Sequence, residues 1–303
     1  MKQQPPASPS CDGNRNNSMD GNKEIAGVAD WRLLLDEAAD GAWNMAADEA
    51  MLLSHAAGKA GPTLRFYAWS PAAVSLGYFQ HADAEIDRAA CANRGIDVVR
   101  RLTGGRAVLH DAEVTYSLVV RESEAYIPNG VTASYLFFSR GIVAGLARLG
   151  INAQMQAPGV AGARSDEKAI RSSVCFDAPS YYELTVGGRK IVGSAQVRKD
   201  GILLQHGSIL LDFQPERIVN ILRLADERTG KILLQELAQR ATSLSAVSGR
   251  KIGFYEVSTA VAAGMAKECG MNLVKGERTK AETEMARSLA KNKYCAEEWN
   301  LRR

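Results

Sequence analysis

The sequence has no long run of apolar residues. Its longest runs of large apolar side chains, such as Leu33–Leu35, are far shorter than the ~18 residues that a membrane span requires. Residues 1–29 are rich in Pro, Ser, Asn, Gly and Asp and lack the apolar stretch of a secretion signal. We therefore expect a soluble, cytoplasmic protein with no membrane partner. We expect residues 1–29 to form a flexible tail, with Met19 as an alternative start.

Cysteine and histidine are scarce and scattered. The chain has 5 cysteines and 4 histidines, and neither type shows metal-ligand spacing or an HExxH pattern. An odd number of cysteines without a secretion signal also argues against a disulfide framework. The sequence therefore predicts free thiols and no bound metal.

An excess of charge of one sign is also missing. Lys+Arg number 37 and Asp+Glu number 34, which leaves a net charge of +3. Such a balance predicts neither a nucleic-acid coat nor a membrane-surface binder. The basic residues that do cluster are not interleaved with aromatic side chains for stacking bases: Arg100, Arg101, Arg106, Arg189, Lys190, Arg198 and Lys199. We expect no nucleic-acid partner, whereas an acidic protein partner fits this local charge.

The order of the predicted elements indicates the fold class. The 303 residues, 46% of them hydrophobic, suit a globular chain of about one or two domains. Strand patterns dominate residues 30–211, broken by helical patterns, and helical patterns follow Pro215 without regular βαβ alternation. This predicts an α+β fold with a mixed, largely antiparallel β-sheet flanked by helices. We expect a main domain over 30–248 and a C-terminal helical extension over 249–303.

The first candidate site is the segment Arg101–His110, which places two adjacent glycines between predicted strands and beside arginines. Backbone without side chains lets a ligand approach closely, and exposed N–H groups near guanidinium groups suit a carboxylate, a phosphate or an acyl carbonyl. The alternative is a Gly-Gly loop with solvated arginines. The candidate residues are Arg101, Thr103, Gly104, Gly105 and His110.

The second candidate is a cysteine paired with a lysine. Cys175 lies in a turn-forming stretch just before a predicted hairpin over 181–195, whose turn is Gly187-Gly188. Only the thiolate is nucleophilic, and a nearby cation favours it. Lys190, at the start of the returning strand, is the candidate cation and can also stabilise an oxyanion. The alternative is a buried, inert cysteine and a solvated lysine.

His206 lies between two strand-like segments, 201–205 and 207–211, which we interpret as a further pair of strands. A histidine in this setting is either a core residue or part of a pocket wall, and the pattern favours the core. The same holds for His110.

Three motifs, taken together, resemble the catalytic domain of the biotin/lipoate protein ligase superfamily. They are Arg101-Leu-Thr-Gly-Gly-Arg-Ala-Val-Leu-His110, Gly188-Arg-Lys-Ile-Val-Gly-Ser-Ala-Gln196 and Gln205-His-Gly-Ser-Ile-Leu-Leu211. Their order and spacing are more specific than any one of them, and the resemblance covers about 31–246. Within the superfamily, the segments Cys175–Glu183 and Tyr294–Leu301 resemble the octanoyltransferases that move octanoyl from acyl carrier protein to the glycine cleavage system H protein.

The resemblance implies the roles of the site residues. Cys175 would hold the acyl group as a thioester, and Lys190 would lower the pKa of the thiol. The acyl pocket would be lined by the Arg101–His110 segment and by Gly193, Ser194 and Ala195, and we add His206 as a substrate-binding candidate. No ATP or other cofactor is implied, because exchange between thioesters is nearly isoenergetic and the attack of a lysine amine is downhill. We expect a monomer whose donor is octanoyl-acyl carrier protein and whose acceptor is the H protein or another lipoyl domain.

Three alternatives remain open. An amidotransferase that passes octanoyl from the H protein to other lipoyl domains also uses a cysteine. The second alternative is an ATP-dependent lipoate ligase. Such ligases typically carry Asn-Asp where this chain has Cys175-Phe-Asp-Ala-Pro-Ser, so this chain has a nucleophile where a ligase needs none. This chain also differs from the commoner octanoyltransferases, which place their cysteine after the His-Gly strand, where this chain has Asp212–Pro215. A non-catalytic protein that binds acyl chains or lipoyl domains is the third alternative.

Overall fold

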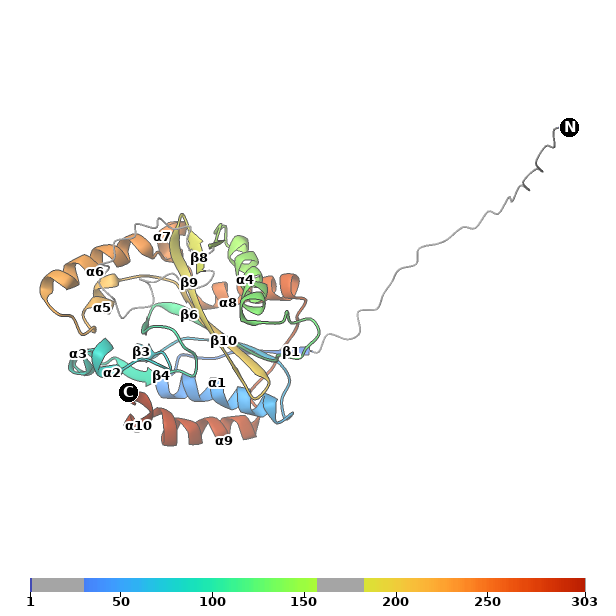
Figure 1. Cartoon of the computed structure of the whole chain (residues 1–303), viewed down its shortest axis with the longest axis horizontal. Coiled ribbons are helices and arrows are strands. Elements are labelled where there is room, and N and C mark those ends of the chain that lie inside the picture. Colours follow the sequence, from blue (N-terminus) through green and yellow to red (C-terminus); the bar gives the residue numbers. More distant parts are fainter. Residues whose placement is uncertain (2–29, 157–182, 303) are drawn as a thin grey trace.

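The computed structural model describes Met1 and residues 30–156 and 183–302. The predicted N-terminal tail and Cys175 lie outside these residues. Within them the strands form two sheets, and Figure 1 shows helices on both sides of the larger one.

The larger sheet is mixed, with its strands in the order β11-β1-β2-β6-β10-β9-β8-β7. Strand β1 pairs in parallel with β2 and β11, and the other pairings are antiparallel. The strands are β1 (Asp30–Leu35), β2 (Thr63–Tyr67), β6 (Glu113–Arg121), β7 (Gln154–Gln156), β8 (Glu183–Val186), β9 (Arg189–Lys199), β10 (Ile202–Leu210) and β11 (Asn272–Lys275). The smaller sheet has the order β4-β3-β5, with β3 (Ala73–Leu76), β4 (Asp97–Arg100) and β5 (Val108–His110).

Two pairs of helices cover the larger sheet (Figure 1). On one face α4 (Val131–Arg148) packs against α8 (Phe254–Cys269), and on the other α1 (Gly41–Ala56) packs against α9 (Lys280–Leu289). The remaining helical segments are α2 (Ala82–Glu85), α3 (Arg88–Asn93), α5 (Pro215–Val219), α6 (Glu227–Arg240), α7 (Leu244–Ser248), a π-helical turn (Ala290–Tyr294) and α10 (Glu297–Asn300). The α+β class with a mixed sheet and C-terminal helices is confirmed.

Strand β6 separates two buried environments by its period-2 alternation. Val114, Tyr116, Leu118 and Val120 join the core beneath α4 and α8. Ser117 faces the other way, where its hydroxyl group donates to Asp48 of α1. The α1 side of the sheet is therefore polar in its interior, and the candidate site lies there.

Helix α1 begins at a favourable cap and is almost wholly buried. The Asp40 carboxylate accepts a hydrogen bond of 2.7 Å from the backbone N–H of Trp43, which satisfies one of the free donors of the first turn. Asp48 and Glu49 are 2% and 3% exposed. Buried carboxylates require partners, and both residues have them.

The structure corrects the interpretation of residues 201–211. They do not form two strands separated at His206, because Ile202–Leu210 is one continuous strand, β10, that pairs with β6 and β9 along its length. The turn lies before it, at Asp200 and Gly201, whose φ angles are +54° and +74°. Consecutive positive φ angles suit a tight hairpin turn. His206 and Gly207 are therefore mid-strand residues.

The C-terminal part of the chain includes a strand that the sequence pattern did not indicate. The segment Asn272–Lys275 forms β11 at the edge of the larger sheet, and three of its four residues are exposed. An exposed edge strand of this length lacks apolar alternation, which explains why it was missed. Helix α8 contributes Val257, Val261 and Met265 to the main core. The domain boundaries at 30, 248 and 249 stay predictions. Among the described residues no helix is long and apolar enough to cross a membrane.

Candidate active site

A cavity of about 90 Å³ with a largely apolar wall lies where α1, the smaller sheet and strands β9 and β10 meet. Eight of the sequence-predicted residues line it: Arg101, Gly105, His110, Lys190, Gly193, Ser194, Ala195 and His206. Thr103 lies behind this wall and reaches it through His206. Gly104 belongs to the same loop and is not part of the wall. Cys175 lies outside the described residues.

Strand pairing brings two of the sequence motifs together. In the register of β9 with β10, Gly193 is opposite Ser208, Ser194 is opposite Gly207 and Ala195 is opposite His206. A Cβ atom at Gly207 would lie 2.5 Å from the Ser194 hydroxyl oxygen, which is too close for any other residue. The two motifs therefore form one wall because they are neighbours across a hairpin.

Arg101 holds the Gly104-Gly105 loop in place. Its guanidinium group donates to the backbone carbonyls of Ser75, Gly104 and Arg106 at 2.8, 2.8 and 2.7 Å. The side chain is buried, at 4% exposure. A guanidinium with several fixed acceptors acts as a rigid brace. Arg101 thus shapes the loop, and its predicted contact with substrate remains a prediction.

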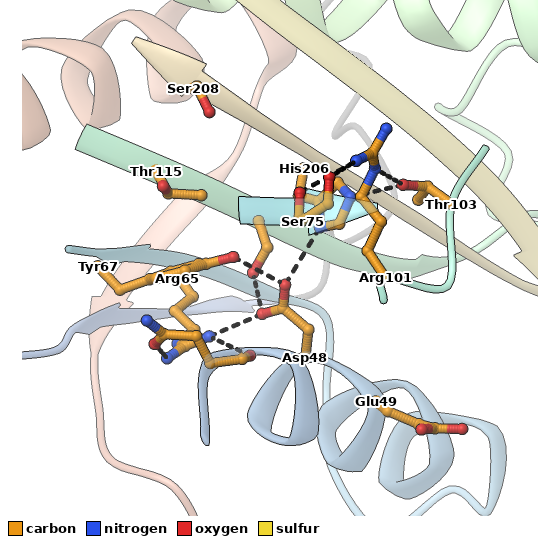
Figure 2. Close-up of polar contacts among 12 residues, drawn as sticks. Asp48, Glu49, Arg65, Tyr67, Ser75, Arg101, Thr103, Thr115, His206 and Ser208 are labelled. Carbon is orange, nitrogen blue, oxygen red and sulfur yellow. Dashed lines mark hydrogen bonds and ion pairs between the residues drawn. The ribbon is translucent and has the colours of Figure 1, made fainter. Parts of the chain in front are cut away.

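A directional chain of hydrogen bonds runs from Arg101 to Asp48 (Figure 2). Arg101 Nε donates to the Thr103 hydroxyl at 3.1 Å, and this hydroxyl lies 2.7 Å from Nε2 of His206. His206 Nδ1 lies 3.4 Å from Oδ2 of Asp48. Since a guanidinium only donates and a carboxylate only accepts, we assign Thr103 as the donor to Nε2 and Nδ1 as the protonated nitrogen of His206.

A second chain of hydrogen bonds starts at the same guanidinium group. Arg101 Nη1 donates to the Ser75 hydroxyl at 3.0 Å, and that hydroxyl lies 2.8 Å from Nε2 of His110. His110 Nδ1 is 2.8 Å from Oε1 of Glu113, which also accepts from the hydroxyl groups of Thr115 and Ser208. One arginine therefore orients both cavity histidines, each through one hydroxyl group, and each histidine ends on a buried carboxylate.

Asp48 gathers four donors. Its Oδ1 accepts from Arg65 Nη1 at 2.8 Å and from the Ser117 hydroxyl at 2.7 Å, and its Oδ2 accepts from the Tyr67 hydroxyl at 3.1 Å in addition to His206. Burial alone would raise the pKa of Asp48, but hydrogen bonding to His206 and the charge of Arg65 hold it below its usual value of 3.8. Asp48 is therefore a carboxylate, although it is 2% exposed.

Burial affects the pKa of His206 more strongly than the neighbouring Asp48 carboxylate does. Removal from water lowers the pKa of His206 below its usual value of 6.5, and the Asp48 carboxylate, which acts in the opposite direction, does not reverse this. His206 is thus a neutral imidazole at neutral pH. This agrees with the hydrogen-bond assignment, in which Nε2 accepts.

Lys190 is part of the cavity wall, and its side chain is 3% exposed. Its Nζ lies 2.7 Å from Oε1 of Glu183 on the neighbouring strand β8. A Cβ atom at Gly193 would lie 3.0 Å from Cε and 3.3 Å from Nζ of Lys190. Gly193 therefore leaves the space that this ammonium group occupies.

The sequence reasoning did not single out the residues that support this wall. Besides Asp48 and Glu113 they include Ser75, Thr115 and Trp69, whose ring stacks on His110 with centroids 4.1 Å apart and an interplanar angle of 12°. Trp69 Nε1 also donates to the Thr115 hydroxyl at 2.7 Å. Only Asp48 left a usable signal, an acid within the apolar helical stretch 45–53. Within residues 30–156 and 183–302, no three His, Cys, Asp or Glu residues are placed to hold a metal ion.

Comparison with known proteins agrees with this geometry. The model of the lipoyl protein ligase A/B catalytic domain matches residues 40–266. The octanoyltransferase LipM of Kyrpidia tusciae is 46% identical over 273 residues, which are 90% of this chain and 99% of that protein. The chain belongs to the octanoyltransferase LipM family. The LipM proteins of Brevibacillus brevis and Bacillus subtilis are 42% and 39% identical, each match covering 90% of this chain and 99% and 98% of the relative, respectively.

Solved structures of lipoate ligases share the fold of this LipM-family chain. A bipartite lipoate protein ligase of Thermoplasma acidophilum aligns with a TM-score of 0.74 at 25% identity, covering 90% of this chain and 96% of its own. A lipoate-protein ligase A bound with ATP aligns with a TM-score of 0.73 at 26% identity, covering 90% and 99%. The family resemblance seen in the motifs is confirmed, and the chain is an acyltransferase.

Proposed function

We propose that this protein moves an octanoyl group from octanoyl-acyl carrier protein to a lysine of the glycine cleavage system H protein or another lipoyl domain. The LipM relatives carry the name octanoyltransferase, which supports the octanoyl group. The neighbouring Thermoplasma acidophilum structure pairs a lipoate ligase with an E2 lipoyl domain, which supports a lipoyl domain as acceptor. The protein acts in the cytoplasm as a monomer.

The observation that carries the proposal is Lys190, a buried lysine in the wall of an apolar cavity. An acyl chain requires an apolar cavity, and its thioester carbonyl requires a fixed positive group close to the developing oxyanion. In the proposal Lys190 supplies this charge and favours the thiolate form of Cys175.

Two transfers follow from this arrangement. The Cys175 thiolate attacks the carbonyl carbon of the carrier-bound octanoyl group, the bond from that carbon to the carrier sulfur breaks, and the carrier thiolate leaves and takes up a proton. The ε-amine of the acceptor lysine then attacks the Cys175 thioester. The carbon–sulfur bond breaks, the amine loses a proton and Cys175 returns as a thiol or thiolate. The product is an amide, and neither step requires ATP.

Intact-protein mass spectrometry tests the first transfer. The purified protein is mixed with octanoyl-acyl carrier protein without ATP, and the wild type is compared with Cys175→Ala and Cys295→Ala. Cys295 is exposed and serves as the matched control. We expect one octanoyl group on the wild type and on Cys295→Ala, removed by hydroxylamine, and none on Cys175→Ala. An adduct that persists in Cys175→Ala contradicts the proposed nucleophile.

The same assay separates the alternatives. The ATP-bound ligase neighbour makes an ATP-dependent ligase the competing function. Labelling that appears only with free octanoate, ATP and magnesium would support that function and leave Cys175 without a catalytic role. An adduct formed from octanoyl-H protein and not from octanoyl-acyl carrier protein would identify an amidotransferase.

A further inference from the structure

The last ten residues described, Lys293–Arg302, dock onto the backbone that supports the cavity. We call them the C-terminal clasp; they lie beyond the 40–266 match of the catalytic-domain model. We propose that the clasp, acting through Arg100, positions the Gly104-Gly105 loop and thereby sets which acyl chains the cavity accepts. The second half of this proposal rests on the proposed acyl transfer.

Arg100 links the clasp to a turn near the cavity. It is 0% exposed, and its guanidinium group donates to carbonyl oxygens of the clasp at Trp299 (3.1 Å), Asn300 (3.0 Å) and Arg302 (2.8 Å). The same group donates to the carbonyl oxygens of Gly77 and Gln80, both at 2.8 Å. A buried guanidinium with fixed acceptors in two segments holds these segments at one distance.

The clasp also completes an open strand edge. Strand β4 is an edge strand of the smaller sheet, and it ends at Arg100. The backbone N–H of Arg100 donates to Oδ1 of Asn300 at 2.9 Å, and its carbonyl accepts from Nε1 of Trp299 at 3.0 Å. Two side chains of the clasp therefore take the place of a neighbouring strand at this residue.

The turn 77–80 lies directly against the Gly104-Gly105 loop. The backbone N–H of Tyr78 donates to the carbonyl of Thr103 at 2.9 Å. A Cβ atom at Gly77 would lie 1.9 Å from the carbonyl oxygen of Gly105, so the two backbones are already in contact. Because Gly105 lines the cavity, a shift of this turn changes the cavity wall.

The other end of the clasp anchors to α1. Lys293 Nζ lies 2.7 and 2.8 Å from the two oxygens of Glu49, and the Tyr294 hydroxyl donates to the same carboxylate at 2.8 Å. Two cations contact the Trp299 ring, with Lys293 Nζ 3.9 Å and the Arg302 guanidinium carbon 3.8 Å from the ring centre. Such contacts fix the indole ring and with it the Nε1–H that reaches Arg100.

In two pairs of adjacent residues, one residue belongs to the cavity and the other binds the clasp. Asp48 and Arg101 belong to the hydrogen-bond chains of the cavity, whereas their neighbours Glu49 and Arg100 bind the clasp. The side chains of Asp48 and Glu49 point in different directions because consecutive residues of a helix are rotated by about 100°. The clasp therefore binds the residues next to both ends of the hydrogen-bond chain that orients His206.

The test uses Asn300→Ala and Trp299→Phe, which remove one contact to Arg100 each. The control is Glu297→Ala in the same segment, since the side chains of Glu297 and its partner Arg88 are 76% and 44% exposed and such pairs contribute little. Hydrogen exchange is followed by mass spectrometry on the full chain, and transfer is compared between octanoyl and decanoyl carrier protein.

We expect amide exchange to be about five- to ten-fold faster within 77–80 and 100–105 in both variants, which is the change produced by one lost hydrogen bond. Exchange in β6 and β10 should stay at the wild-type rate. The ratio of octanoyl to decanoyl transfer should shift by a similar factor, and Glu297→Ala should match the wild type in both measurements. A merely structural role would lower transfer of both chains equally.

Unchanged exchange within 77–80 and 100–105 overturns the proposal, and so does faster exchange that is spread equally over the whole chain. An unchanged octanoyl-to-decanoyl ratio overturns the role in chain selection even where the loop exchanges faster. A wild-type protein that transfers neither chain contradicts the proposed function instead, and the exchange rates then decide the positioning role alone.

Discussion

The hydroxyl oxygen of Thr103 lies 2.7 Å from Nε2 of His206, although 103 positions separate the two residues. This contact joins the Gly-Gly loop to the middle of β10. The contact also sets the tautomer of His206, which lines the cavity. The Thr103 oxygen accepts a hydrogen bond from Arg101 Nε, so the Thr103 hydroxyl proton is directed to Nε2 of His206.

Thr103→Val should weaken both the fold and the transfer. The substitution keeps the shape but leaves Nε2 of His206 and Nε of Arg101 without this hydroxyl partner, at a cost of about 1–3 kcal/mol. We expect a lower free energy of unfolding in urea and a lower kcat, with a smaller effect on KM. Thr103→Ser retains the hydroxyl group and should restore the wild-type kcat. Equal kcat values for the Val and Ser variants would exclude this role.

Gly193→Ala should displace the Lys190 ammonium group. The new Cβ would lie 3.0 Å from Lys190 Cε, so the lysine must move within the cavity wall. We expect about a ten-fold or larger fall in acyl-enzyme formation, because a charge positioned for an oxyanion loses its effect when it shifts. Gly61→Ala is the matched control, since its Cβ would meet nothing closer than 3.7 Å. Wild-type rates of acylation in Gly193→Ala would contradict the assigned place of Lys190.

Asp48→Asn should destabilise the protein. The substitution removes the charge that partners Arg65 and replaces one acceptor oxygen by a donor amide, at a site where four donors converge. Breaking a buried pair in this way costs about 3 kcal/mol, measured as the free energy of unfolding in urea. Asp226→Asn is the control, because the exposed Asp226 caps helix α6 and Asn caps equally well. A cost for Asp48→Asn no greater than for the control would contradict this account.

Stability should decline as the pH falls below about 6.5, in part because of His206. Its pKa is lowered by burial in the folded protein, so the unfolded chain binds a proton there and the folded chain does not. The stabilisation is therefore complete above 6.5 and is lost as the pH falls toward the folded pKa. Asp48 acts in a separate window, because its lowered pKa matters only below about 3.8.

His206→Gln should flatten this decline. The variant and the wild type should show parallel melting temperatures above pH 7.5 and converge between pH 6.5 and 5, as measured by circular dichroism. A residual slope is expected from His55, whose pKa is also lowered by burial. Curves that stay parallel down to pH 5 would mean that His206 is not kept neutral by the fold.

The described cysteines should differ sharply in reactivity. Burial raises the pKa of Cys91 to about 11 and that of Cys269 to about 12, and both are buried, whereas Cys295 is exposed. Iodoacetamide at pH 7.5 should therefore label Cys295 in the folded protein and reach Cys91 and Cys269 only after unfolding, as followed by peptide mapping. Rapid labelling of Cys91 in the folded state would show that α3 opens locally.

Local patterns were sufficient for many elements. Helix α1, strand β3 and the Gly187-Gly188 turn follow from periodicity and turn chemistry within a few residues. The prediction of two strands around His206 was wrong because a glycine in the middle of a strand resembles a turn residue. Gly207 lies in mid-strand because a side chain there would collide with β9. Strand β11 was missed because its pairing with β1 comes from residues about 240 positions away.

The sequence by itself determined the fold class, the family and most of the cavity wall, because the three motifs carry the glycines and the charged residues of that wall in a fixed order. Only the tertiary structure decided how these residues are held. Asp48, Ser75 and the C-terminal clasp lie far from the motifs in the chain, and no local pattern couples them; Glu113 follows His110 by three residues, but only the fold directs its carboxylate to that histidine. Their roles arise because buried polar groups must find partners wherever the fold places them. The helices and sheets bring those partners to Arg100, Arg101, His110 and His206.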